Sequence, residues 1–196
     1  MCTTSYTRKF ELILVFVVFN VFLVCSSVSA ENTNKDYFTI RTSQDRRLLR
    51  NVEKYHLGQD KFWKWYNAGK FSLALGELKF VLRYFPNHPK ALQLLSLVAL
   101  VSKKSSLAIP FFQRAITLYP QHALTHAQYG AYLVQMGLIE EGIVKLNVAI
   151  NKNAKLVQGY VWLAQAYEKN GQSELARRAA ERAKVLGYKG QILDTD

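Results

Sequence analysis

Tyr84-Phe85-Pro86-Asn87-His88 returns 34 residues later as Leu118-Tyr119-Pro120-Gln121-His122. Each segment follows an apolar run whose spacing fits one face of a helix. Because proline lacks an amide hydrogen and restricts φ, it ends the helix that precedes it. A further step of the same length reaches Asn153-Ala154-Lys155, which reads as a turn without the proline. This period predicts a series of helical hairpins.

Small residues recur with the same period at two positions of each hairpin. A glycine after the first helix can adopt the positive φ that ends a helix. A small residue in the second helix lets two antiparallel helices approach closely. One hairpin cannot bury its apolar face alone, so successive hairpins are expected to stack. The first position holds Gly69, Gly137 and Gly171, with Lys103 as the exception, and the second holds Ala74, Ala108, Gly142 and Ala176.

Three units carry bulky and small residues at matching helical positions. They are Leu92, Leu95, Ala108, Phe112, Ala115 and Pro120 in one unit, Gly130, Leu133, Gly137 and Ala149 in the next, and Tyr160, Leu163, Ala164, Tyr167, Gly171, Ala176 and Ala183 in the last. With these residues the chain resembles the tetratricopeptide repeat family, over units at 55–88, 89–122, 123–156 and 157–190. The first unit is degenerate, since Gly58 and Lys61 stand where the family usually has apolar residues. The resemblance implies an all-α, right-handed superhelical solenoid of about four hairpins.

Residues 1–30 read as a secretory signal peptide. Arg8 and Lys9 precede an apolar run over residues 12–25, and Val28 and Ala30 then provide the small residues of a cleavage site after Ala30. As a helix the run would extend roughly 21 Å, short of the roughly 30 Å of bilayer hydrocarbon. An uncleaved anchor that continues through the following serines is the alternative. The pattern predicts an exported protein of the periplasm or cell envelope.

The repeats have polar flanks on both sides. Residues 31–43 are predicted to form a flexible linker. Residues 44–57 read as an amphipathic N-terminal capping helix, with Ser43 as its N-cap. The second helix of the last unit carries charged residues around a stripe of alanines, so it can serve as its own polar cap. Residues 191–196 are predicted to be a short tail.

The positive charge of the chain is concentrated in one part of the sequence. The net charge is +12, yet residues 78–139 contain no acidic residue. Such a band can bind an acidic protein or, as the alternative function, another polyanion or an anionic membrane. A solvated face of a basic protein explains the same pattern without a partner. The basic side chains are Lys79, Arg83, Lys90, Lys103, Lys104 and Arg114.

The resemblance also implies a binding groove. In the family, the first helices of successive hairpins line a concave surface that takes peptides or helices of partner proteins. Carried over position by position, the centre of this surface is predicted to be apolar and aromatic, which suits peptide capture. The alternative is that some of these side chains pack under the capping helix as core. The predicted groove residues are Trp63, Tyr66, Asn67, Lys90, Gln93, Leu97, Leu100, Val101, Val134 and Gln135.

Motifs for catalysis or metal binding are scarce. No cysteine pair has zinc-ligand spacing, and His122 with His126 lacks a third ligand, so neither a metal site nor a cofactor is predicted. The sequence has no Gly-rich phosphate loop or nucleophile elbow, which argues against an enzyme and a small-molecule substrate. We therefore predict a non-enzymatic scaffold or adaptor that binds a protein or peptide and assists assembly or maturation of a bacterial envelope complex. Export argues against nucleic acid as a partner, and an uncleaved N-terminal segment would provide contact with a membrane.

Overall fold

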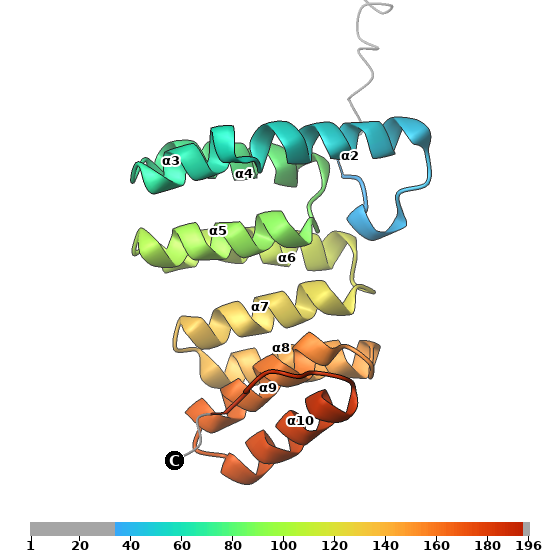
Figure 1. The fold of residues 1–196 in the computed structure, drawn as a ribbon, viewed down its shortest axis with the longest axis vertical. Helices are drawn as coiled ribbons and strands as arrows, with labels where there is room; N and C mark the ends of the chain where they lie inside the picture. Colours follow the sequence, from blue (N-terminus) through green and yellow to red (C-terminus); the bar gives the residue numbers. More distant parts are fainter. Residues whose placement is uncertain (1–33, 194–196) are drawn as a thin grey trace, which may run out of the picture. The chain divides into compact units, whose positions relative to one another are not determined.

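The computed structural model describes residues 34–193, and these residues form a stack of helical hairpins without β-strands (Figure 1). The predicted all-α solenoid is confirmed. The predicted signal peptide lies outside the described residues, as do 31–33 and 194–196. The elements are η1 (Tyr37–Thr39), α2 (Ser43–His56), η2 (Gln59–Trp63), α3 (Lys64–Asn67), α4 (Phe71–Tyr84), α5 (Pro89–Val101), η3 (Ser105–Ala108), α6 (Ile109–Leu118), α7 (Ala123–Gln135), α8 (Ile139–Lys152), α9 (Val157–Lys169) and α10 (Ser173–Val185).

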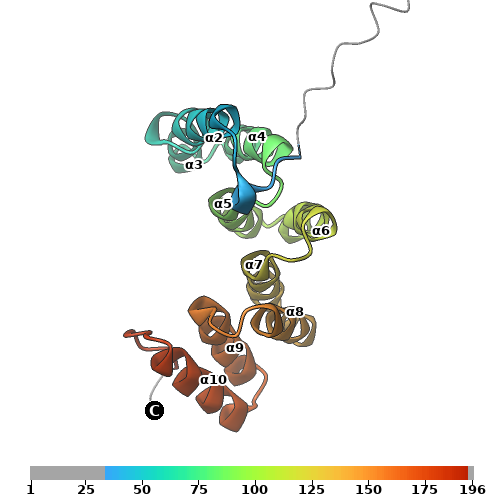
Figure 2. The ribbon, with the colours of Figure 1, turned by 90° about the vertical axis from the view of Figure 1, so that its right-hand side faces the viewer.

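The helices begin with the period seen in the sequence. The first helices α5, α7 and α9 begin at Pro89, Ala123 and Val157, so each start follows the last by 34 residues. The second helical segments α4, η3, α8 and α10 keep the same interval from Phe71 onward. Figure 2 shows α5 and α7 on one side of the stack, and α6 and α8 on the other. The repeat unit of the sequence is therefore the structural hairpin.

Within the third hairpin, the two helices touch through their backbones. A Cβ added to Gly130 of α7 would lie 2.7 Å from the carbonyl oxygen of Gly142 in α8, and one added to Gly142 would lie 2.8 Å from the oxygen of Gly130. Ala164 and Ala176, one period later, are both fully buried. Only small residues allow this approach, which explains the periodic column of Ala and Gly.

The turns inside the hairpins share one backbone geometry. After α3, the amide of Gly69 donates to the oxygen of Tyr66 at 3.0 Å, and the amide of Lys70 donates to Trp65 at 2.9 Å. This pair of bonds is a Schellman motif, which requires a left-handed residue. Gly69, Gly137 and Gly171 have φ of 67°, 87° and 70°, and Lys103 adopts the same conformation with φ of 56°. The positive φ predicted for the glycine column is confirmed, and it extends to the lysine.

Neighbouring hairpins stack through aromatic and aliphatic side chains. The ring of Phe112 in α6 lies 5.2 Å from that of Tyr129 and 5.7 Å from that of Tyr132, both in α7. Phe112 is fully buried, and Tyr132 is 1% exposed. Burial of this kind supplies most of the favourable free energy that holds successive hairpins together. Between residues 34 and 193, no helix combines the length and apolar character that a membrane crossing requires.

The degenerate first unit departs from regular helix. Its first helix is divided into a π-helical segment, η2, and the short α3. The capping helix α2 ends at His56, and Gly58 separates it from η2. The N-cap of α2 is Thr42 rather than the predicted Ser43, because the Thr42 hydroxyl accepts from the Asp45 amide at 3.0 Å.

We expect Gly130→Ala to lower the free energy of unfolding by about 2 kcal/mol, because the added methyl group would collide with the α8 backbone. Chemical denaturation followed by circular dichroism measures this change.

Gly76→Ala in α4 is the matched control. Nothing lies within 4 Å of an added Cβ at Gly76, so alanine should raise stability there by about 0.5–1 kcal/mol. Equal effects of the two substitutions would show that the hairpin does not depend on this approach.

Candidate functional site

A largely apolar groove of about 590 Å³ lies on the first helices and is here called the central groove. It is built from the end of η2 and from α5, α7 and α9, so three consecutive hairpins and the degenerate first unit contribute to it. Its lining mixes aliphatic, aromatic and amide side chains with one lysine. The lining residues are Trp63, Lys90, Gln93, Leu94, Ser96, Leu97, Leu100, Gln128, Ala131, Tyr132, Gln135 and Trp162.

Several predicted groove residues meet in the central groove. Leu97 and Leu100 lie on one turn of α5, and they are half-buried rather than part of the closed core. Trp63 and Gln135 come from the units on either side. The remaining predicted members that line the groove are Lys90 and Gln93.

Four predicted groove residues lie elsewhere. Val101 and Asn67 are the exposed last residues of α5 and α3 and do not line the central groove, and Val101 instead lines a hollow at the turns. Tyr66 belongs to an aromatic cluster, with its ring 5.7 Å from that of Phe62 and 5.8 Å from that of Phe71. Val134 is 8% exposed and packs toward α8.

Sequence reasoning missed other lining residues. Trp162 closes the groove from α9, and Leu94 and Gln128 hold the same position in the two preceding units. Each is the sixth residue of its unit, a position that the family pattern did not mark for the groove. The sequence nevertheless contained an indication of this lining residue, because Trp162 stands in the predicted first helix of the fourth hairpin.

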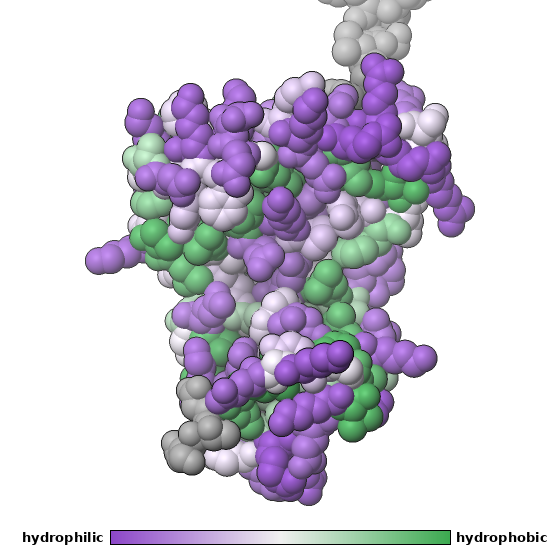
Figure 3. All heavy atoms as spheres, viewed as in Figure 1, coloured by the Kyte–Doolittle hydropathy of each residue, from purple (hydrophilic) through white to green (hydrophobic). Residues whose placement is uncertain are grey.

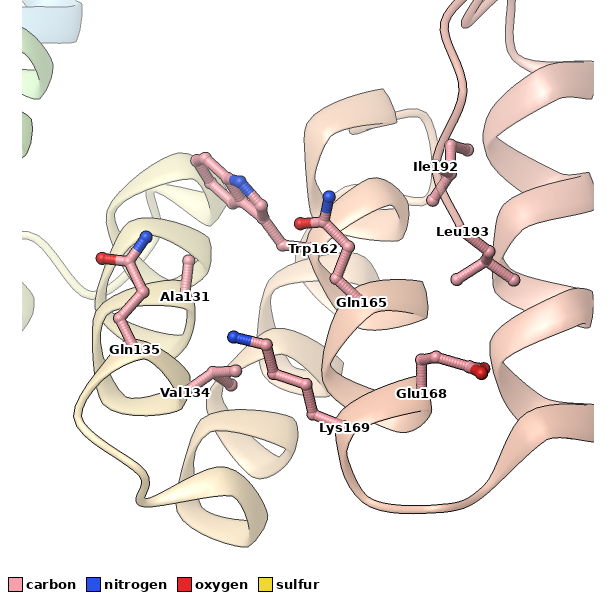
Figure 4. A pocket seen from close by; sticks show the side chains of 9 residues that line it. All are labelled: Ala131, Val134, Gln135, Trp162, Gln165, Glu168, Lys169, Ile192 and Leu193. Atoms are coloured by element: carbon pink, nitrogen blue, oxygen red, sulfur yellow. The ribbon is translucent and has the colours of Figure 1, made fainter. Parts of the chain in front are cut away.

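The segment after α10 folds back onto α9 and reaches a smaller cavity of about 360 Å³ (Figure 4). Ile192 is 8% exposed and, with Leu193, lines this cavity opposite Val134 and Trp162. Figure 4 shows Lys169 extending from α9 toward α7. Residues 191–196 were predicted to be a tail, but Ile192 packs against the repeats because its side chain finds an apolar surface there.

The predicted basic residues do not share one face. Lys90 lines the central groove on α5, whereas Lys103 and Lys104 stand at the turn after α5. Arg114 lies on α6 and donates to the Asn34 side chain at 2.7 Å and to the Leu82 oxygen at 3.3 Å. Hydrophilic and apolar areas alternate over the face shown in Figure 3. The acid-free band of the sequence is therefore divided among the groove, the turns and the second helices.

Residues 34–40, predicted to be part of a flexible linker, lie across the turns between hairpins. Asp36 Oδ1 accepts from the Asn87 side chain at 2.7 Å and from the Phe38 amide at 3.1 Å. Its other oxygen, Oδ2, lies 2.7 Å from His122 Nε2. The segment is thus tied to both of the proline-containing turns that set the period of the sequence.

Two pairs of tilted aromatic rings add to these hydrogen bonds. The Tyr37 ring lies 4.7 Å from His88, and the Phe38 ring lies 4.5 Å from His122. We therefore correct the linker prediction for residues 34–40, here called the strap. The reason is that Asn87, the partner of Asp36 and Tyr37, is 50 or more positions away in the sequence, and local polarity gives no information about such a partner.

Among the titratable groups described, His88 has the most strongly shifted pKa. Its side chain is 1% exposed, Nδ1 accepts from the Ala91 amide at 3.2 Å, and Nε2 lies 3.2 Å from Glu53 Oε1. Because Nδ1 accepts, the ring proton is on Nε2 and is donated to Glu53. Burial lowers the pKa of His88 from 6.5 to about 4. For Asp36, burial raises the pKa, but hydrogen bonds from His122, Asn87 and the Phe38 amide outweigh it and hold the pKa below its usual value.

The polar cluster at these turns has a structural role, because it holds the strap against the repeats. Asp36 supplies His122 with the carboxylate that its neighbourhood in the sequence lacks. Between residues 34 and 193, however, no three His, Cys, Asp or Glu side chains are grouped so that they could hold a metal ion. His126 Nε2 lies 2.9 Å from the Pro120 oxygen, and so faces the turn instead of His122.

Comparisons with known proteins identify the repeat. The tetratricopeptide repeat family model matches residues 66–123, from the end of α3 to the beginning of α7. No curated protein matches the chain. The match shows that this segment carries tetratricopeptide repeats.

Solved structures share the fold at low identity. The crystal structure of MamA is 20% identical, with a TM-score of 0.51, over 73% of this chain and 80% of that chain. MamA 41-end from Desulfovibrio magneticus RS-1 is 18% identical, with a TM-score of 0.51, over 74% and 86%. YrrB, described as a TPR protein with an unusual peptide-binding site, is 17% identical with a TM-score of 0.49, and the chain spans 63% of its length, using 63% of its own.

We expect the protein to lose stability as pH falls from 6.5 toward 4. The folded pKa of His88 lies below its ordinary value, so the unfolded chain takes up the proton first. The stabilisation is therefore present above pH 6.5 and lost below it, by up to about 3 kcal/mol. Thermal unfolding of wild type and His88→Asn across this range measures the effect, since asparagine can still cap α5.

As pH falls from 6.5 toward 4, His88→Asn should lose less stability than wild type, although it should still lose some. Burial also lowers the pKa of His126, which contributes with the same sign. A His88 ring that titrates near pH 6.5 by NMR would contradict the explanation.

Proposed function

We propose that this chain, which carries tetratricopeptide repeats over residues 66–123, is a non-enzymatic scaffold that binds a partner peptide or helix in its central groove. Tetratricopeptide repeats generally mediate protein–protein interactions, and stacked repeats do so through extended inner surfaces. The observation that carries the proposal is the groove itself, where Trp63, Leu97, Leu100 and Trp162 from three units line one hollow.

The chemistry of the lining suits a peptide. Half-buried leucines and indole rings can hold apolar side chains of a partner, and such anchors supply most of the binding free energy of an interface. The amides of Gln93 and Gln135 are exposed at the groove and can pair with a peptide backbone. Lys90 adds one positive charge, which favours an acidic residue in the partner.

The central groove adjoins the smaller cavity at α9. Ala131, Gln135 and Trp162 line both hollows, and Ile192 and Leu193 line only the smaller one. A partner that lies over η2, α5 and α7 can therefore extend toward α9. The division of the basic residues among several faces favours this groove over a continuous polyanion-binding band.

We expect Leu97→Asp to weaken binding of groove ligands by about tenfold or more, because it places a carboxylate in the apolar centre. Peptides selected from a displayed random library with the purified protein provide the ligands, and fluorescence anisotropy measures their affinities.

Val144→Asp is the matched control, since Val144 is 59% exposed on the second helix α8. Selected peptides should bind this variant as they bind wild type. Equal affinity of wild type and Leu97→Asp would place binding outside the groove.

We further propose that the protein works in the bacterial cell envelope, where it assists assembly or maturation of a complex. Support comes from the signal-peptide pattern of residues 1–30. When the full chain is expressed with its own N-terminus, the mature protein should be periplasmic and should begin at Glu31. N-terminal sequencing of the exported protein tests this. An intact N-terminus in the membrane fraction would favour the anchor, and a cytoplasmic protein would refute the envelope role.

A further inference from the structure

A second hollow lies outside the central groove, at the turns after α3 and α5. It has a volume of about 610 Å³ and is lined by residues 69–73 and 101–104. We name it the turn hollow. Val101, predicted for the groove, is one of its members. In Figure 3, viewed as in Figure 1, apolar surface bordered by hydrophilic side chains occupies the end of the first hairpins where these turns lie.

Stacking of the repeats places charges side by side in the turn hollow. Lys70 and Lys104 are one period apart and close equivalent Schellman motifs, with amides donating to Trp65 and Ala99 at 2.9 Å each. The corresponding residues of the third and fourth units are Leu138 and Gln172. The lysines therefore belong to the first two turns and are not a requirement of the turn geometry.

Lys103 provides a second, independent observation. Its φ of 56° is the left-handed conformation that glycine adopts at the three equivalent positions. A side chain in this conformation costs conformational free energy that glycine would avoid. The fold does not require a lysine here, and strained residues of this kind tend to occur where a side chain serves function.

The chemistry of the turn hollow combines an apolar floor with a basic rim. Leu73 and Val101 are each 48% exposed, although both are aliphatic. Lys70 lies 5.6 Å from the centre of the Trp65 ring, which extends the mixed aromatic and basic surface toward α3. No acidic residue is among those that line the turn hollow.

We propose that the turn hollow binds an acidic segment of a partner protein, in addition to the ligand of the central groove. Carboxylates of the segment pair with Lys70, Lys103 and Lys104, and an apolar side chain between them packs on Leu73 and Val101. A hollow of this volume accepts individual side chains, whereas a bilayer surface is contacted by apolar side chains that protrude. The exposed lysines also speed association by attracting the acidic segment.

The test uses a fluorescein-labelled peptide of repeated Asp-Glu-Leu, with repeated Asp-Glu-Ser as the peptide without apolar anchors. Lys103→Gly should weaken binding of the first peptide about threefold, and Lys70→Ser/Lys103→Gly/Lys104→Ser about tenfold or more. Lys103→Gly should also raise the melting temperature by about 2–4 °C, because it relieves the left-handed strain. A variant that is more stable yet binds less tightly cannot owe its weaker binding to unfolding.

Matched variants separate this surface from others. Lys79→Ser removes an exposed lysine of α4 outside the turn hollow and should leave binding unchanged. Leu97→Asp alters the central groove and should also leave binding of the acidic peptide unchanged. Failure of this proposal can therefore be told apart from failure of the groove proposal.

Several results would overturn the proposal. These are wild-type affinity of the triple lysine variant, loss of peptide binding in Leu97→Asp, and binding to phosphatidylserine vesicles without binding to the peptide. Equal affinity for the Asp-Glu-Ser peptide would show that the exposed Leu73 and Val101 take no part, and would also contradict it.

Discussion

The structure depends on the close packing of the two helical segments of a hairpin, which is a backbone contact in the third hairpin. Gly130 and Gly142 approach so closely that a methyl group on either would meet the carbonyl oxygen of the other. This approach closes the hairpin and leaves an apolar face that only a neighbouring hairpin can cover. Stacking follows, as in the contact of Phe112 with Tyr129. The first helices then lie in one layer, and the central groove is formed on that layer.

The turns impose the second constraint. It differs between the turns inside the hairpins, at one edge of the stack, and the turns between hairpins, at the other edge. Inside the hairpins, left-handed residues close Schellman motifs and allow a 34-residue period to be kept. Between the hairpins, Pro86 and Pro120 end the second helices, and the strap ties these two turns together through Asp36. The buried His88 joins the same edge to the capping helix through Glu53. One edge is thus locked by polar contacts, whereas the other exposes lysines and aliphatic side chains.

This division gives the two candidate surfaces different chemistry. The central groove is an aliphatic and aromatic trough with amides along it, suited to an extended or helical segment. The turn hollow combines lysines with exposed aliphatic side chains, and it lies where the lysines of two successive units meet. A scaffold with both surfaces could hold a partner by an apolar anchor and an acidic segment at once. Two linked contacts raise the overall affinity more than either contact alone.

The sequence by itself determined the all-α repeat, its period and the left-handed turns, because each of these depends on residues within one hairpin. With the family resemblance, it also indicated much of the groove, since Leu97 and Gln93 stand at positions that the resemblance assigns to the groove. Only the tertiary structure decided the contacts of residues 34–40 and of Ile192, whose partners are distant in the sequence or on another helix. It also decided that Val101 faces a turn, because the end of α5 sets the direction of that side chain. Local patterns carry helix and turn preferences, whereas contacts between distant segments exist only once the hairpins have stacked.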